Sequence, residues 1–136
     1  MTAYLLDTNV ASHVIKGDRE DILRHLTAVP IDELAVSSVT EAELLYGVAK
    51  RGHPLALTQR VREFLLRVDV LDWDREAAQA YGELRARSES RGVSLAPLDM
   101  MIAAHALAAG AVLVTRDKAF THISEDLVIE DWTQNP

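Results

Sequence analysis

The stretch YLLDTN, residues 4–9, decides how the rest of the chain is interpreted. A short apolar run with the length of a buried strand ends abruptly on the carboxylate of Asp7, and a helix-like segment follows from Thr8. The same pattern recurs near the other end of the chain, where the apolar residues 111–114 lead into Asp117. Two apolar strands that each end in an acid raise the question of whether these two acids meet.

Apolar runs alternate with helical periodicities along the chain. Strands are expected at residues 3–6, 34–37, 68–71, 111–114 and 127–129. Helices are expected at residues 8–16, 18–29, 39–50, 54–68 and 74–91, and from Pro97 to a stop at Gly110. This alternation predicts an α/β fold with a central, mostly parallel sheet flanked by helices. Ligands of such sheets bind outside the carboxyl ends of the strands, so Asp7 and Asp117 are expected in one crevice.

Length and composition favour a single domain that spans residues 1–136. Hydrophobic residues make up 49% of the chain and charged residues 26%, which is enough for a buried core. The absence of cysteine excludes disulfides, thiolate nucleophiles and cysteine zinc sites. No signal peptide is visible, and the longest nearly apolar run, residues 100–114, is too short to span a membrane. We therefore expect a cytoplasmic protein with no membrane association.

Two of the acids also have a purely structural interpretation. Asp7 is a favoured N-cap for the helix that begins at Thr8. Glu43 follows Thr40 by three residues, which is the spacing of a capping box. Because Ser38 forms the same box with Glu41, the start of this helix does not require Glu43.

The helix that begins with Asp99 favours a functional role for that acid. From residue 100 to residue 109 only His105 is polar, so this helix must be buried, and His105 is expected to be a hydrogen-bonded core residue. Asp117 alone would suit a turn. Carboxylates that converge on one crevice cannot all ionise cheaply without a counter-charge, and oxygen ligands without cysteine select Mg²⁺ or Mn²⁺. Together, the acids predict a metal site.

The motifs that carry these acids resemble those of PIN-domain ribonucleases, and most of all the VapC-type toxins of toxin–antitoxin pairs. In chain order they are Asp7-Thr8-Asn9, Thr40-x-x-Glu43 before Leu44 and Gly47, Pro97-x-Asp99 before Ile102-Ala103, and Thr115-x-Asp117. The resemblance covers essentially the whole chain. It implies a single PIN-like domain with an acidic quartet of Asp7, Glu43, Asp99 and Asp117, supported by the polar side chains of Thr8, Asn9, Thr40 and Thr115.

The resemblance also implies an activity and partners. The expected reaction is Mg²⁺-dependent hydrolysis of phosphodiester bonds in structured RNA, with Mn²⁺ as the alternative ion. The resemblance is greatest to the branch of the family that cuts the anticodon loop of initiator tRNA. Asp7 and Asp99 would hold the principal ion, while Glu43 and Asp117 would complete its shell or orient water. A cognate antitoxin would inhibit the enzyme through a segment that reaches the acidic crevice. The resemblance further implies a homodimer, formed through the helices at residues 39–50 and 54–68.

The net charge of −7 argues at first against an RNA partner. Removing the four negative charges of the quartet leaves −3, and the basic residues are clustered. One cluster, between residues 47 and 67, opposes a single acid and contains Lys50, Arg51, Arg60, Arg62 and Arg67. A second cluster contains Arg85, Arg87 and Arg91, for which the structural alternative is i,i+4 pairing of Glu83 with Arg87 and of Arg85 with Glu89.

Other classes of protein were weighed against this interpretation. A non-catalytic α/β binding module that acts on a partner or an operator would share the fold, although the presence of all four acids counts against it. A phosphoacceptor receiver domain would need an acidic residue at the end of a central strand, and none ends residues 34–37. A dinucleotide-binding fold is disfavoured because no G-x-G-x-x-G follows the first strand.

Overall fold

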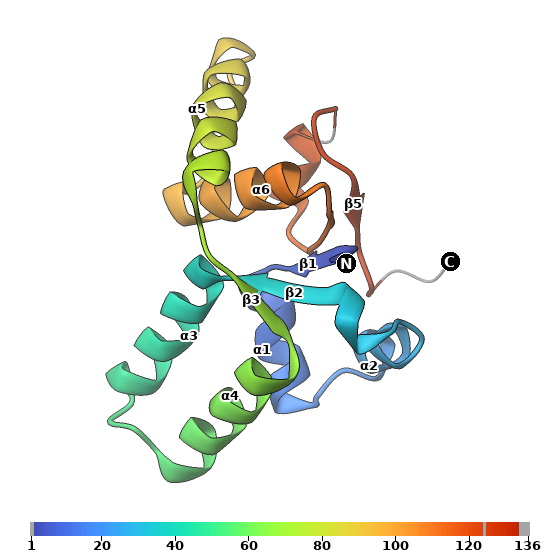
Figure 1. Ribbon diagram of the computed structural model, residues 1–136, viewed down its shortest axis with the longest axis vertical. Helices are drawn as coiled ribbons and strands as arrows, with labels where there is room; N and C mark the ends of the chain where they lie inside the picture. Colours follow the sequence, from blue (N-terminus) through green and yellow to red (C-terminus); the bar gives the residue numbers. More distant parts are fainter. Residues whose placement is uncertain (1, 124, 134–136) are drawn as a thin grey trace.

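A five-stranded sheet forms the centre of the protein, shown in Figure 1 as a computed structural model that describes residues 2–123 and 125–133. Its strands are β1 (Tyr4–Leu6), β2 (Leu34–Ser37), β3 (Asp69–Leu71), β4 (Val112–Val114) and β5 (Ile129–Glu130). They follow the order β3-β2-β1-β4-β5, and every neighbouring pair is parallel. The predicted α/β fold with a parallel central sheet is confirmed.

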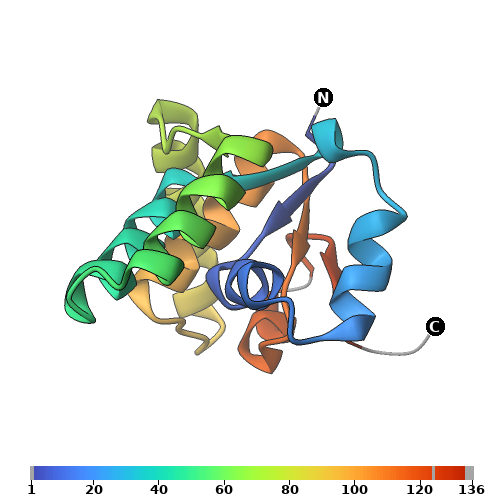
Figure 2. The same cartoon turned by 90° about the horizontal axis from the view of Figure 1, so that it is seen from below.

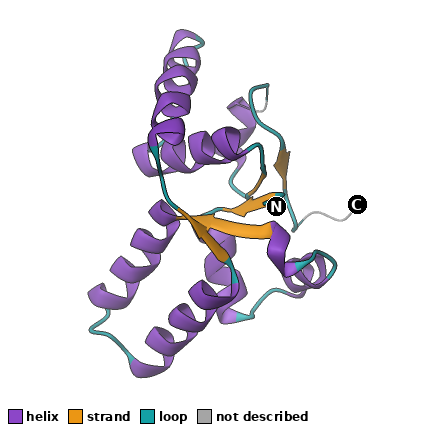
Figure 3. Ribbon diagram, viewed as in Figure 1, coloured by secondary structure: helices purple, strands orange, loops and turns teal. Residues whose placement is uncertain are grey.

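The described residues form six α-helices around this sheet (Figure 3). They are α1 (Thr8–Lys16), α2 (Glu20–Thr27), α3 (Ser38–Lys50), α4 (Leu55–Arg67), α5 (Arg75–Ser90) and α6 (Pro97–Ala109). Two short 3₁₀ helices, η1 (Ile31–Glu33) and η2 (Lys118–Ile123), precede β2 and follow β4. Each expected α-helix agrees with the structure within two residues at either end. Nowhere in residues 2–123 and 125–133 does a helix combine the length and the apolar character needed to cross a membrane.

The sheet divides the hydrophobic core into two halves. Leu5 and Leu113 face α5 and α6, whereas Leu6, Val36 and Val114 face the side of α1, α2, α3 and α4. Figures 1 and 2 show these two groups of helices on opposite sides of the sheet. Both faces of the strands are therefore buried, as is usual for parallel sheets, and this explains why the strands are short apolar runs.

The carboxyl ends of the parallel strands lie along one edge of the sheet, which we call the carboxyl edge. β1 ends immediately before Asp7, β4 ends immediately before Thr115, and β2 ends at Ser37. Helices α1 and α3 both start at this edge and lie in contact with each other. The opposite margin, where the strands begin, is called the amino edge. This arrangement lets residues far apart in the sequence meet at the carboxyl edge.

Candidate metal centre at the carboxyl edge

Asp7 is buried at the carboxyl edge, with 5% of its surface exposed. Its Oδ1 accepts a hydrogen bond from the backbone N–H of Val10 at 2.8 Å, and its Oδ2 accepts one from the hydroxyl of Thr115 at 2.5 Å. Burial raises the pKa of Asp7 to about 6; the two hydrogen bonds oppose this shift, and the nearby Asp99 and Asp117 add to it. Asp7 is thus the helix N-cap and also part of a cluster of acids.

Glu43 is held by a side chain of α1 and takes no part in a capping box. The hydroxyl of Thr8 donates to Glu43 Oε1 at 2.6 Å and lies 3.1 Å from the hydroxyl of Thr40. The N-cap of α3 is Ser37, whose hydroxyl accepts from Val39 N–H at 3.0 Å. Both capping boxes considered from the sequence are therefore wrong, because the helix begins one residue earlier than expected and the extended residue before it supplies the cap.

Asp99 lies in the first turn of α6, which Pro97 opens, and is partly exposed. Its pKa is raised, first by desolvation and then by the charges of Asp117 and Glu43. Asp99 is thus the member of the quartet whose pKa is raised by the charge of Glu43, the other acid that a helix carries. Its carboxylate is close enough to those of Asp7 and Asp117 to interact with them electrostatically.

Asp117 is exposed in the turn after β4. Its Oδ1 accepts from Ala119 N–H at 2.9 Å, and its own N–H donates to the hydroxyl of Thr115 at 3.0 Å. Thr115 therefore accepts from the backbone of Asp117 and donates to Asp7. The turn interpretation of Asp117 is confirmed, and the same turn fixes its carboxylate beside the other acids.

The structure brings the four predicted acids to one place. Asp7 interacts electrostatically with Asp99 and Asp117, and Asp99 interacts with Asp117 and Glu43. As they are placed, no three His, Asp or Glu side chains within the described ranges converge closely enough to enclose an ion. The donor set consists of carboxylate oxygens whose charges repel one another, and it fits a hard divalent cation that would relieve this repulsion.

A buried contact that the sequence did not reveal joins two of the helices that carry the acids. His105 Nδ1 of α6 lies 2.7 Å from the hydroxyl of Ser37, the cap of α3. Burial lowers the pKa of His105, so the ring is neutral at pH 7 and is the hydrogen-bonded core residue expected from the sequence. A serine directly before a helix signals a cap, but nothing in the sequence pairs it with a histidine 68 residues away.

The second basic cluster is largely neutralised by ion pairs. Arg87 and Arg91 bind Asp126 at 3.2 and 2.8 Å, and Arg85 binds Glu89 at 3.0 Å. The expected pair of Arg85 with Glu89 is confirmed, whereas Arg87 pairs with Asp126 instead of with a residue on its own helix. Arg87 and Arg91 thereby connect α5 to the segment before β5.

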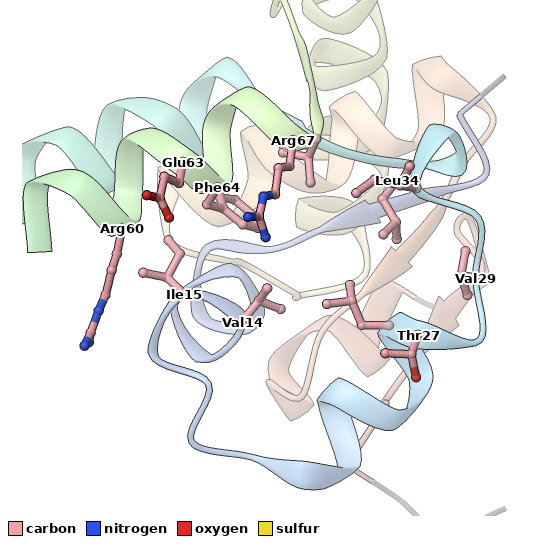
Figure 4. A pocket seen from close by; sticks show the side chains of 12 residues that line it. Val14, Ile15, Thr27, Val29, Leu34, Arg60, Glu63, Phe64 and Arg67 are labelled. Carbon is pink, nitrogen blue, oxygen red and sulfur yellow. The ribbon is translucent and has the colours of Figure 1, made fainter.

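A cavity of about 340 Å³ lies away from the acids, at the amino edge between α1, α2 and α4 (Figure 4). We call it the amino-edge cavity. Its walls are mainly apolar and include Val14, Leu26, Leu34 and Phe64, with Arg60, Glu63 and Arg67 also among its lining residues. None of the four acids lines it. This cavity and the candidate chemistry therefore occupy different edges of the sheet.

Comparisons with known proteins agree with this architecture. The PIN domain family model matches residues 4–126. The tRNA(fMet)-specific endonuclease VapC of Salmonella typhimurium is 36% identical over 132 residues, which are 97% of this chain and 99% of that protein. Ribonuclease VapC2 of Rickettsia felis is 34% identical over 131 residues, 95% of this chain and 97% of that protein.

Solved structures lead to the same group of proteins. The crystal structure of DNA-bound VapBC from Salmonella typhimurium contains a chain that is 36% identical, with a TM-score of 0.89 and coverage of 97% of this chain and 99% of that one. The VapBC2 complex of Rickettsia felis bound to a DNA fragment from its promoter gives 31% identity and a TM-score of 0.85, covering 95% of this chain and 98% of the other.

Proposed function

The chain belongs to the PIN domain family, among the VapC proteins, and from this premise we propose that it is a metal-dependent endoribonuclease whose single domain spans residues 1–136. The observation that carries the proposal is that Asp7, Glu43, Asp99 and Asp117 lie near enough to one another at the carboxyl edge to interact electrostatically. The relatives named above are called ribonucleases or endonucleases, which supports RNA as the substrate class.

Asp7 and Asp99 would hold a divalent ion, Mg²⁺ or Mn²⁺, with Glu43 and Asp117 completing the set of oxygen ligands. Bound there, the ion would lower the pKa of a water molecule and stabilise negative charge on the leaving oxygen. The surrounding hydroxyls keep the carboxylates in place: Thr115 holds Asp7, and Thr8 holds Glu43. No side-chain nucleophile is required, because water attacks the phosphodiester.

The proposed substrate is a structured RNA, with the anticodon loop of initiator tRNA as the first candidate. The names of relatives that cut tRNA(fMet) support this choice. Sequence-specific recognition of RNA usually targets unstacked bases of loops. Asp99 is partly exposed and Asp117 is exposed at the carboxyl edge, where such a loop could approach them.

The proposed regulator is a cognate antitoxin, since the related solved structures are VapBC toxin–antitoxin complexes. The amino-edge cavity supports this assignment, because its apolar walls suit the apolar side chains of a protein partner. A homodimer through α3 and α4 is also proposed. Leu45 is 52% exposed and Leu66 is 81% exposed, and both line a hollow of about 300 Å³ between these two helices.

The test is cleavage of tRNA and of single-stranded RNA by the purified protein with and without Mg²⁺. We expect wild-type cleavage only with the ion, loss of cleavage in Asp99→Asn, and full cleavage in Asp69→Asn, a control at an exposed acid outside the quartet. Cleavage by a correctly folded Asp99→Asn protein would falsify the mechanism. Binding of operator DNA by a wild-type protein that cuts no RNA would support the non-catalytic module instead.

A further inference from the structure

A second hollow, of about 130 Å³, adjoins the acidic cluster and follows the cleft between α1 and α3. We call it the α1–α3 groove. Three residues of α1 and three of α3, each set spaced by four, supply its polar and small lining. They are Thr8, Ser12 and Lys16 from α1, and Glu43, Gly47 and Arg51 at the end of α3. Ile15, Leu44, Val48 and Leu57 supply the apolar part.

The two ends of the α1–α3 groove carry opposite charge. Glu43 and Arg51 are eight residues apart, which is about 12 Å along a helix, and the same spacing separates Thr8 from Lys16. The groove therefore starts at the carboxylates of the candidate metal centre and ends between two cations. Among the residues that the structure describes, neither Lys16 nor Arg51 forms an ion pair.

A structural explanation accounts for part of this pattern. Cations at the C-terminal ends of helices interact favourably with the helix dipole, and Lys16 and Arg51 occupy such positions. Because α1 and α3 both start at the carboxyl edge and lie in contact, this effect also places both cations at the same end of the hollow between them. This arrangement gives the α1–α3 groove a basic end suited to an anion.

Gly47 is the small residue midway along the groove, in the interior of α3. Glycine destabilises a helix interior relative to alanine, so its presence needs a reason. A Cβ built at Gly47 would meet no atom within 4 Å, which means that the packing of the described chain does not require glycine there. A side chain at this position would instead occupy space in the groove. Glycine is a residue used where a ligand approaches the backbone closely.

We propose that the α1–α3 groove binds the RNA strand next to the phosphodiester that is cut. One phosphate of the strand lies at the basic end, in contact with Lys16 and Arg51, and the adjoining ribose passes over Gly47. The phosphate takes the basic end because Glu43 repels an anion at the other. This inference rests on the proposed nuclease function, and it places the single-stranded part of the substrate, such as a loop, on one side of the metal centre.

The test uses two matched pairs of variants in the full chain. Gly47→Ala is compared with Gly82→Ala, because Gly82 is also a helix-interior glycine with open space around its Cβ but does not line the groove. Arg51→Gln is compared with Arg24→Gln, an exposed arginine of α2 outside the groove. Melting temperature, KM and kcat for a single-stranded RNA are measured for each. RNA affinity is also measured against salt concentration in an Asp7→Asn background that does not cleave.

Both glycine variants should raise the melting temperature by about 2–4 °C, because alanine favours the helix. Only Gly47→Ala should raise KM and weaken RNA binding, so stability and binding change in opposite directions at this residue alone. Arg51→Gln should raise KM about tenfold with kcat unchanged, the effect of losing one charge-assisted contact. It should also reduce the slope of log affinity against log salt by about 0.7. Arg24→Gln should do neither.

Three results overturn the inference. If the wild type cleaves RNA while Gly47→Ala and Arg51→Gln keep its KM and salt slope, the groove is not an RNA site but the nuclease proposal stands. If these variants keep RNA affinity and lose antitoxin affinity, the groove belongs to the antitoxin. A wild type that neither binds nor cleaves RNA removes the nuclease proposal together with the groove. If Gly47→Ala lowers the melting temperature, a loss of RNA binding in that variant could reflect unfolding, and the result of Arg51→Gln then decides.

Discussion

The two edges of the sheet are built by the same strands and helices, yet they hold opposite kinds of surface. The carboxyl edge gathers four carboxylates from two strand ends and two helices, and there burial and mutual repulsion raise the pKa of Asp7 and of Asp99. The amino edge encloses an apolar cavity that none of these acids lines. The difference places the proposed chemistry and the apolar cavity at opposite edges of one small α/β fold, so that each can be changed without the other.

The largest expected effect is at the carboxyl edge. Asp7→Asn should reduce RNA cleavage by about 10³-fold or more, because this variant removes a principal ligand of the metal ion. Such an ion lowers the free energy of the charged transition state by several kcal/mol. The melting temperature should not fall, since the variant also removes a desolvated charge. Single-turnover cleavage and thermal unfolding check both parts. A large loss of stability would mean that Asp7 is mainly a structural cap and would weaken the contrast between the edges.

The next effect is at the amino edge and concerns stability alone. Leu34 is 2% exposed, begins β2 and lines the amino-edge cavity. Leu34→Ala should lower the free energy of unfolding by about 2–5 kcal/mol through loss of buried surface and enlargement of the cavity, while kcat per folded molecule stays unchanged. Urea denaturation measures the change, with Val128→Ala, at a residue 65% exposed, as the control. A fall in kcat would show that the edges are coupled.

The free energy of unfolding is expected to depend on pH because the carboxylate of Asp7 is desolvated and lies near other acids. The pKa of Asp7 is about 6 in the folded metal-free protein and 3.8 in the reference state, so the folded state binds the proton more tightly. Its contribution to stability is present below pH 4 and is lost as pH rises through 6, by at most about 3 kcal/mol. Asp7→Asn should lack this loss. Acids with lowered pKa outside the cluster, such as Asp21, act in the opposite direction in both proteins and cancel in the difference.

The control for this prediction is Mg²⁺. The ion should compete with the proton, lower the apparent pKa of Asp7 and flatten the difference between the two proteins. Unfolding free energies measured from pH 4 to pH 8, without and with Mg²⁺, give both comparisons. Parallel curves for wild type and Asp7→Asn in the absence of metal would show that the carboxylate is not strained.

The smallest expected effect is that of Arg60, which lines the amino-edge cavity and not the acidic crevice. Arg60→Gln should change the KM for RNA by less than about twofold and leave the salt dependence unaltered, because no phosphate contact is lost. A salt titration of RNA binding measures this. A slope reduced by about 0.7 would show that the RNA crosses to the amino edge and that the two edges are not functionally separate.

Local sequence signals predicted the elements that position the acids. The helix at residues 8–16 was located correctly because Asp7 caps its start and Gly17, with φ of +64°, ends it in the left-handed conformation that favours glycine. Strand β2 also agrees with its predicted range. In the same way, Pro97 and Gly110 mark the two ends of α6. Such signals lie within a few residues of the boundary that they set, which is why a single sequence reveals them.

The interactions that the sequence did not reveal are between residues far apart in the chain. The partner of Arg87 is Asp126, not an i,i+4 neighbour, and the partner of Glu43 is Thr8, on another helix. The last strand was expected at residues 127–129 but is Ile129–Glu130, because Leu127 packs into the core before the chain joins the sheet. The hydrophobic pattern of a sequence shows that a residue is apolar. It does not show whether that residue belongs to a strand of the sheet or packs into the core outside it.

The position of β1 has a consequence for how the protein is made. β1 lies in the middle of the sheet, between β2 and β4, and the adjacent Asp7 accepts a hydrogen bond from a hydroxyl that follows 108 residues later in the chain. Contacts of such long sequence separation close late in folding. A chain that ends before residue 112 has no β4, no Thr115 and no Asp117, so Asp7 lacks its hydroxyl donor and the quartet lacks its fourth acid. The proposed nuclease therefore becomes competent only after β4 and the turn that follows it have been synthesised.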